Sequence, residues 1–266
     1  MASYHSRSNS FASQSHPVIN DVEDRLERLK ASQATSTSSS SSICSNLASL
    51  RDLHDNINNM IQMSSTQQAL SQEQGKNWIN ELLEGSLKLV DLCGFSRDIV
   101  HLTKESVQDL ESSIRRTRSE DSNAYVASRK KINKMINKCI KNLKCSSNQN
   151  STPLPTIGMW LKDAESVELS ILKSVLILLS GENNKKSWSL LLKFTQTNSR
   201  VYSEAEQEDL CSLNNIHKSR KSIDSKSMLK QLKTSEMSIQ EIEEGLEALF
   251  RSLVKTRVSL LNVLSH

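Results

Sequence analysis

Histidine and cysteine are the side chains of this sequence that could bind a metal ion or attack a substrate, so their spacing is considered first. The six histidines are spread along the whole chain, at His5, His16, His54, His101, His217 and His266. The five cysteines are just as scattered, at Cys44, Cys93, Cys139, Cys145 and Cys211. The spacing of Cys139 and Cys145 fits neither a zinc site nor one face of a helix, and no HExxH, CxxC, GxSxG, GxGxxG or GxxxxGK motif is present. We therefore expect no catalytic residue, no metal site and no cofactor, and we predict that the protein is not an enzyme.

Basic side chains could also attract an anionic partner, and they are concentrated in the stretch SRKKINKMINKCIKNLK at residues 128–144. At helical spacing the apolar side chains of this stretch share one arc, which holds Ile132, Met135, Ile136, Cys139, Ile140 and Leu143. The basic side chains fall mostly on the opposite arc. The candidate basic interaction face consists of Arg129, Lys130, Lys131, Lys134, Lys138 and Lys141. No acidic residue interrupts the stretch.

A basic amphipathic helix of this kind has several interpretations. It can lie on an anionic membrane surface, grip the phosphates of a nucleic acid, or serve as the target helix of a calcium sensor. The simpler interpretation is a helix that faces the protein core and carries a solvated row of lysines. The stretch has no aromatic residue to anchor in a bilayer or to stack on a base, which favours the simpler interpretation and argues against nucleic acid as the partner.

The opening segment HSRSNSFASQSHP offers a candidate modification site. Arg7 lies three residues before Ser10, a spacing that basophilic kinases favour, so Ser8 and Ser10 are candidate phosphorylation sites. A phosphate group would add about 1.5 to 2 negative charges at each serine and could pair with arginines in this chain or in a partner. The alternative is an unmodified, disordered terminus.

Helices must position these side chains, because the composition disfavours other folds. The 266 residues include only 6 glycines and 3 prolines, and 4% of them are aromatic, so turn formers and strand formers are few. The net charge of +4 is small, so it makes no general case for nucleic acid or membrane as a partner. The longest apolar run, Val175 to Leu179, is too short to span a membrane. We predict an all-α protein of the cytoplasm, with a nuclear or membrane-peripheral location as the alternatives.

Changes in composition divide the chain into four parts. Residues 1–42 read as a mostly disordered, serine-rich arm that carries a short amphipathic helix at 18–30. A helical part follows at 43–145, and the polar, proline-containing stretch 146–156 is the predicted linker. A second helical part covers 157–266, and we expect it to pack with 43–145 as one domain.

Periodicity and capping signals predict where several helices begin. Ser71 and Gln74 are spaced as a capping box, which predicts that a long helix begins there and runs to Ile114, with Gly85 and Gly94 as points of bending or breakage. Ser238 and Glu241 predict the start of the final helix. That helix repeats apolar residues at heptad spacing, at Ile239, Ile242, Leu246, Leu249, Leu253, Leu260 and Val263, with Thr256 as a polar interruption. A second apolar seam is formed by Phe250, Val254, Val258, Leu261 and Leu264, which is typical of a helix inside a bundle.

Several segments together resemble a known family. They are, in order, RSNSF, His16-Pro17, SSICSNLASLRDLHD, TQQAL, WINELLEGSLKLVDLC, KESVQDLESSIRR, SRKKINK and LEALFRSLVKTRVSLLNVL. Their combination and order resemble the plant-specific BYPASS-like (BPS-like) family, a plant domain of unknown function, over nearly the whole chain. The proline that often precedes TQQAL in relatives is missing here.

The resemblance implies a helical plant protein linked to root and shoot development and to restraint of a long-range growth signal. It carries over no biochemical activity and no catalytic or ligand residue. We therefore predict an elongated all-α bundle of long antiparallel helices with disordered serine-rich N-terminal segments, acting as a non-enzymatic interaction or regulatory protein whose protein partners are unidentified. The alternative is a peripheral membrane or vesicle-trafficking adaptor that uses the basic helix at 129–144, and the third candidate is a nucleic-acid-binding protein.

Overall fold

The computed structural model describes residues 16–35, 39–117, 123–144, 154–181 and 225–265. Within these residues the chain forms helices and no strands, which confirms the predicted all-α fold. In chain order the helices are α1 (Pro17–Thr35), α2 (Ser40–Ile61), α3 (Ser64–Gln72), α4 (Asn77–Thr117), α5 (Asn123–Lys144), α6 (Thr156–Ser180) and α9 (Ser225–Ser265).

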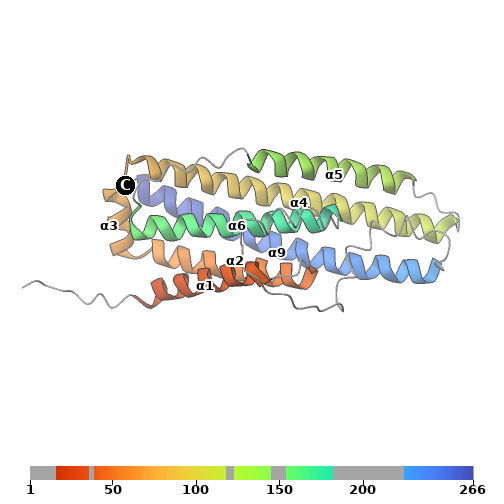
Figure 1. Ribbon diagram of the computed structural model, residues 1–266, viewed down its shortest axis with the longest axis horizontal. Coiled ribbons are helices and arrows are strands. Elements are labelled where there is room, and N and C mark those ends of the chain that lie inside the picture. Colours follow the sequence, from red (N-terminus) through yellow and green to blue (C-terminus); the bar gives the residue numbers. More distant parts are fainter. Residues whose placement is uncertain (1–15, 36–38, 118–122, 145–153, 182–224, 266) are drawn as a thin grey trace, which may run out of the picture.

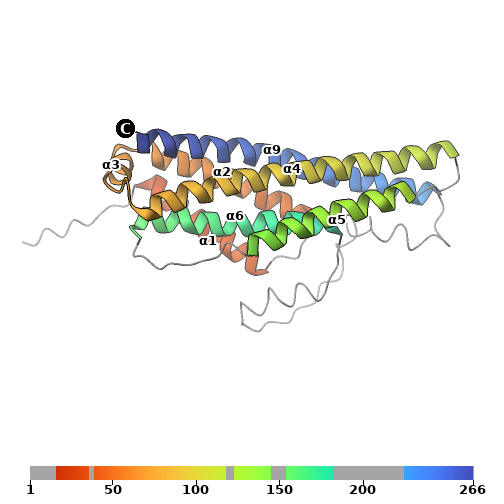
Figure 2. The ribbon, with the colours of Figure 1, turned by 90° about the horizontal axis from the view of Figure 1, so that it is seen from above.

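The long helices lie side by side along one axis and form an elongated bundle (Figure 1). Helices α1, α4 and α6 run in one direction, and α2, α5 and α9 run in the other, as the two perpendicular views show (Figure 2). The nine-residue α3 covers one end of the bundle. Helices α4 and α9 have 41 residues each and set its length. At 1.5 Å per residue each of them is about 60 Å long.

Helix α9 is the central element, because it packs along both α4 and α2. Its register against α4 is antiparallel. The guanidinium of Arg257 donates to the Ser86 hydroxyl at 2.7 Å near one end of the pair. The ammonium of Lys104 reaches Glu243 at 2.6 Å farther along.

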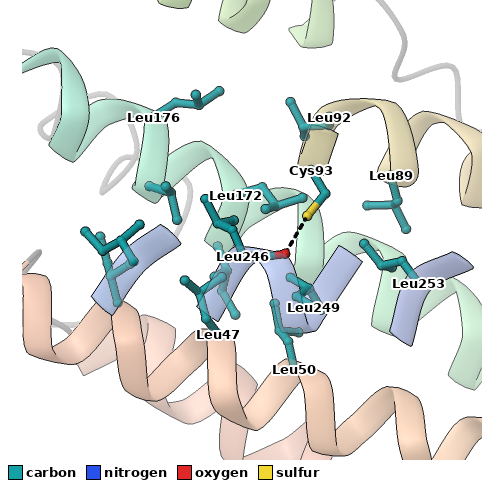
Figure 3. Close-up of a cluster of buried hydrophobic side chains, with 14 of the residues drawn as sticks. Leu47, Leu50, Leu89, Leu92, Cys93, Leu172, Leu176, Leu246, Leu249 and Leu253 are labelled. Carbon is teal, nitrogen blue, oxygen red and sulfur yellow. Dashed lines mark hydrogen bonds between the residues drawn. The ribbon is translucent and has the colours of Figure 1, made fainter. Parts of the chain in front are cut away.

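The core fills the space among α2, α4, α6 and α9. In Figure 3, leucines from all four helices converge on the same layer, among them Leu47, Leu92, Leu172 and Leu246. The predicted heptad positions of α9 from Ile239 to Leu260 supply its side of this core. A β-carbon added to Gly245 would lie 3.1 Å from the Leu47 side chain, so glycine at this position allows α2 and α9 to approach closely.

The predicted start of the long helix at Ser71 is wrong. Helix α3 ends at Gln72, Gly75 adopts a positive φ of 83°, and α4 begins only at Asn77. The two polar side chains of the supposed capping box instead serve the last turn of α9. Gln74 Nε2 donates to the Leu264 carbonyl at 2.7 Å, and the Ser71 hydroxyl donates to the Val263 carbonyl at 3.5 Å. They satisfy carbonyl groups that have no partner within their own helix.

The final helix also begins earlier than its capping signal predicted. Helix α9 starts at Ser225, because Met228 and Leu232 continue the buried stripe upstream of Ser238. Helix α4 in turn runs without a break through Gly85 and Gly94. Packing on both sides of these helices outweighs the small local preference for a break at glycine.

The second apolar seam of α9 is only partly packed. Leu264 is buried and Phe250 is half-buried, but Val254 is 37% exposed, Val258 48% and Leu261 38%. No other described helix fully covers these three side chains. Helix α9 is packed in a bundle as its two seams predicted, although part of the second seam is exposed.

The helix predicted at 18–30 corresponds to α1. Its apolar side chains Val22, Leu26 and Leu29 are buried against the bundle, where α1 packs on α2 and α6. Lys30 pairs with Asp163 of α6 at 2.7 Å, and Ser32 bonds to Asn46 of α2 at 2.8 Å. Within residues 16–35, this segment of the predicted arm is thus an integral helix of the bundle.

Candidate interaction surface

Helix α5 forms an outer edge of the bundle and packs chiefly on α4 and α6 (Figure 2). Its apolar arc faces inward as predicted. Ile132 and Ile136 are buried, at 2% and 0% exposure. The remaining apolar side chains of the arc are partly buried against the core, namely Met135, Cys139, Ile140 and Leu143. One side of α5 is therefore committed to packing, and the other faces outward.

The outward side of α5 carries the residues that we call the lysine face: Lys130, Lys131, Lys134, Lys138 and Lys141, all of them exposed. At 100° per residue these five positions fall within about a quarter to a third of the helix circumference, and they span about 16 Å of its length. The helix contains no acidic residue. Among the described residues none of the ion pairs involves a side chain of the lysine face. The result is a compact row of positive charge without local neutralisation.

Arg129 does not belong to this surface, which corrects its assignment to the basic face. Only 5% of the residue is exposed. Its Nη2 donates to the Leu179 carbonyl of α6 at 2.5 Å, and its Nη1 lies 3.4 Å from the Thr103 hydroxyl of α4. Burial lowers the pKa of the guanidinium, and the neighbouring Tyr125 partly opposes that shift.

The position of Arg129 has a signal in the sequence that the charge pattern concealed. Arg129 precedes Ile132 by three residues and Ile136 by seven, and this spacing places all three on one helical face. Its contact lies at the end of α6, where Gly181 closes the helix in the left-handed conformation at φ 62°. A cation is favourable beside the carbonyls of a helix C-terminus. Arg129 therefore fastens α5 to α4 and α6 and sets the rotation that turns the lysine face outward.

A group of polar side chains is enclosed in the core, and we call it the buried polar cluster: His54, Asn58, Glu168 and Thr256. They come from α2, α6 and α9, and their residues are between 1% and 5% exposed. His54 Nδ1 lies 3.0 Å from the Thr256 hydroxyl, and His54 Nε2 bonds to Glu168 Oε1. Asn58 Nδ2 donates to the same Thr256 hydroxyl at 3.0 Å. The cluster ties three helices together at one level of the bundle.

The hydrogen bonds of Thr256 determine where one histidine proton lies. The Thr256 hydroxyl donates its only hydrogen to the Ser252 carbonyl at 3.0 Å, so it must accept from both His54 and Asn58. His54 Nδ1 therefore carries a hydrogen. His54 Nε2 contacts Glu168 Oε1, so the histidine ring bonds to α9 through one nitrogen and to α6 through the other.

The described cysteines are free thiols without activation. Burial raises the pKa of Cys93 to about 12, although the nearby Arg97 acts in the opposite direction. The Cys93 thiol donates to the Leu246 carbonyl at 3.6 Å, as the dashed line in Figure 3 shows. Burial also raises the pKa of Cys44 and of Cys139. A raised pKa disfavours the thiolate form, which is the nucleophilic form of cysteine.

A shallow groove of about 710 Å³ lies between α4 and α9 and is lined mainly by charged side chains. Its lining holds four carboxylates against two arginines, so its net charge is negative; the carboxylates belong to Asp98, Glu243, Glu244 and Glu247. Arg97 and Arg251 both pair with Glu247, and Arg97 also lies 4.6 Å from the centre of the Phe250 ring. The groove therefore presents an excess of acidic charge, opposite in sign to the lysine face.

The two candidate phosphorylation sites, Ser8 and Ser10, lie outside the described residues. Within the described ranges, no group of at least three His, Cys, Asp or Glu side chains is arranged to hold a metal ion. No helix in the same ranges is long and apolar enough to cross a membrane. Spacing did not reveal the buried contacts of His54, because its partners Glu168 and Thr256 are 114 and 202 residues away in the chain.

A comparison with models of protein families identifies the family of this chain. The family model described as Protein BPS1 matches residues 46–263, which is most of the sequence. The chain belongs to the BPS1 family. This membership confirms the resemblance to BPS-like proteins that the sequence segments indicated. Searches among curated proteins and among solved structures found no match.

The BPS1 family match covers both groups of side chains described above. It begins within α2 before His54 and ends near the last turn of α9, so the buried polar cluster and the lysine face lie inside the matched BPS1 region. Helix α1 precedes it. The bundle of α2 to α9 is therefore the part of this chain that corresponds to the BPS1 family.

Proposed function

We propose that this BPS1-family protein is a non-enzymatic interaction protein that regulates root and shoot development in plants. It would do so by binding partners on the outside of its helical bundle. The developmental setting follows from the resemblance to BPS-like proteins. The observation that carries the proposal is the lysine face of α5, where five exposed lysines form one row without an acidic neighbour in the helix.

The interior of the bundle supports binding rather than catalysis. The core layers are filled by leucine, isoleucine and valine, and the buried polar cluster uses its hydrogen bonds to join helices. Catalysis requires polar groups that converge on a space a substrate can enter. In the described part of the chain, the polar groups of the cluster converge on one another.

The position of the lysine face supports its use as a surface. Partial removal of water from lysines on an exposed helix costs little free energy. Together these lysines attract an anionic partner over a distance of about one Debye length, roughly 8 Å at physiological salt. Helix α5 holds these lysines on a rigid scaffold, since Ile132 and Ile136 are buried and Arg129 bonds to two other helices. A partner would therefore meet a preformed charge array.

Proximity labelling in the native tissue tests this function. The full chain fused to a labelling enzyme is compared with a variant carrying Lys130→Glu, Lys134→Glu and Lys138→Glu. A matched control carries Lys226→Glu, Lys230→Glu and Lys233→Glu, which makes the same charge change on exposed lysines of α9. We expect the face variant to lose more than half of the labelled partners and the control to keep them.

An unchanged partner set in the face variant would show that the lysine face is not the interaction surface. Equal losses in both variants would mean that net charge, rather than this face, governs the interactions. Circular dichroism of both variants checks that the bundle is intact before the comparison is made.

A further inference from the structure

We infer that the lysine face of α5 binds the surface of an anionic lipid bilayer, with α5 lying in the plane of the membrane. This inference rests on the proposed function, because it names the partner of the same surface. Helix α5 lies on an outer edge of the elongated bundle (Figure 2). Its five exposed lysines extend along about 16 Å of the helix.

The chemistry of the face fits lipid headgroups better than nucleic acid. All five side chains are lysines, which are flexible, strongly hydrated point charges, whereas arginine provides the planar fork for bidentate binding of phosphates and guanine. The one arginine of α5, Arg129, is buried. The one aromatic residue of α5, Tyr125, is also buried, so the helix exposes no ring for stacking on a base. Clusters of four to eight basic residues on a helix are typical of binding to anionic lipids.

The packing of α5 determines how it would bind. Amphipathic helices usually insert their apolar side between the lipids. Here that side is occupied, because Ile132 and Ile136 are buried in the bundle and Arg129 holds the end of α6. The protein would therefore stay on the surface of the bilayer and be attracted by charge alone. Binding of this type requires anionic lipid and is weakened by salt.

The size of the effect follows from the number of lysines. Each lysine near an anionic membrane surface strengthens binding about fivefold. Removing three of five should therefore weaken binding about 100-fold, and replacing them with glutamate should weaken it further through repulsion.

Vesicle co-sedimentation of the full chain tests the inference. One set of vesicles contains phosphatidylcholine with about 30% phosphatidylserine, and the other contains phosphatidylcholine alone. Each set is tested at low salt and at about 0.5 M salt, so that only the surface charge and its screening differ. We expect binding only to the anionic vesicles, loss of binding at high salt, and at least about 100-fold weaker binding of the Lys130→Glu, Lys134→Glu, Lys138→Glu variant. The Lys226→Glu, Lys230→Glu, Lys233→Glu variant should keep most of the affinity.

Three outcomes would overturn the inference. They are no binding to anionic vesicles at low salt, equal binding to neutral vesicles, and equal weakening by the α9 control variant. Tighter binding to duplex DNA than to anionic vesicles at the same salt would assign the face to nucleic acid instead. If vesicle binding fails while proximity labelling still depends on the three lysines, the proposed function stands and its partner is a protein.

Discussion

Arg129 and Lys130 are adjacent and both basic, yet the structure gives them opposite roles. Arg129 is buried and bonds to α4 and α6, while Lys130 points outward with the rest of the lysine face. The sequence predicted the amphipathic pattern of this helix correctly, because that pattern depends only on spacing along one element. It misplaced Arg129 because charge was taken as evidence of exposure, although the guanidinium can be buried where carbonyl groups accept its hydrogens.

His54 illustrates what sequence reasoning could not find. Its partners Glu168 and Thr256 lie on other helices, more than a hundred residues away. No local spacing relates these residues, so only the packing of α2, α6 and α9 brings them together. Thr256 was noticed as a polar interruption of the heptad pattern, and its buried hydrogen bonds supply the physical reason for that interruption.

At the same scale we predict the effect of removing the Thr256 hydroxyl. Thr256→Val keeps the side-chain shape but leaves the donors of His54 and Asn58 without an acceptor in the core. Each buried unsatisfied group costs about 1 to 3 kcal/mol, so the loss of the acceptor for two donors should lower the free energy of unfolding by about 2 to 6 kcal/mol. Thr256→Ser keeps the hydroxyl and should cost about 1 kcal/mol for the lost methyl group. Urea unfolding measures both, and equal stability of the valine variant and the wild type would refute the role of the cluster.

At the scale of the elements, capping signals proved less reliable than buried stripes. The apolar periodicity of α4 and α9 predicted long helices correctly. The capping boxes at Ser71 and Ser238 predicted wrong starting points, because a capping box contributes about 1 kcal/mol while several buried turns contribute more. Ser71 and Gln74 bond to the end of α9 instead. These tertiary contacts were invisible in the local sequence.

Helix α5 is the element whose attachment depends most on one polar residue. We predict that Arg129→Lys loosens α5, because one ammonium group cannot reproduce the two directions of the guanidinium toward Thr103 and Leu179. A loss of about 1 to 2 kcal/mol of local stability corresponds to hydrogen exchange that is about 5 to 30 times faster. Hydrogen-exchange mass spectrometry should show this acceleration in α5 while α2 stays unchanged.

The matched control for that experiment is Lys134→Arg, a swap between basic residues on the exposed side of the same helix. It should leave exchange in α5 as it is in the wild type. If Arg129→Lys leaves the exchange of α5 unaltered as well, Arg129 is not what fastens this helix.

At the scale of the whole molecule, the sequence predicted an elongated all-α bundle of long antiparallel helices, and the structure confirms it. Few glycines and prolines and sustained heptad spacing are sufficient for that conclusion. The exposed part of the second α9 seam was not predicted. Which of two apolar stripes faces the core depends on the neighbours of a helix, and spacing within the helix does not contain that information. BPS1 family membership supports the same bundle without defining a partner.

Quantitative acetylation of lysines in the full chain, with and without anionic vesicles, measures whether the lysine face of α5 contacts the bilayer. In the free protein we predict that Lys130, Lys134 and Lys138 react about as fast as Lys226 and Lys230, since all five are exposed. With vesicles containing phosphatidylserine, the three lysines of α5 should become protected at least severalfold while the two lysines of α9 do not. Slow reaction of the lysine face in the free protein, or equal protection of both helices by vesicles, would contradict the account.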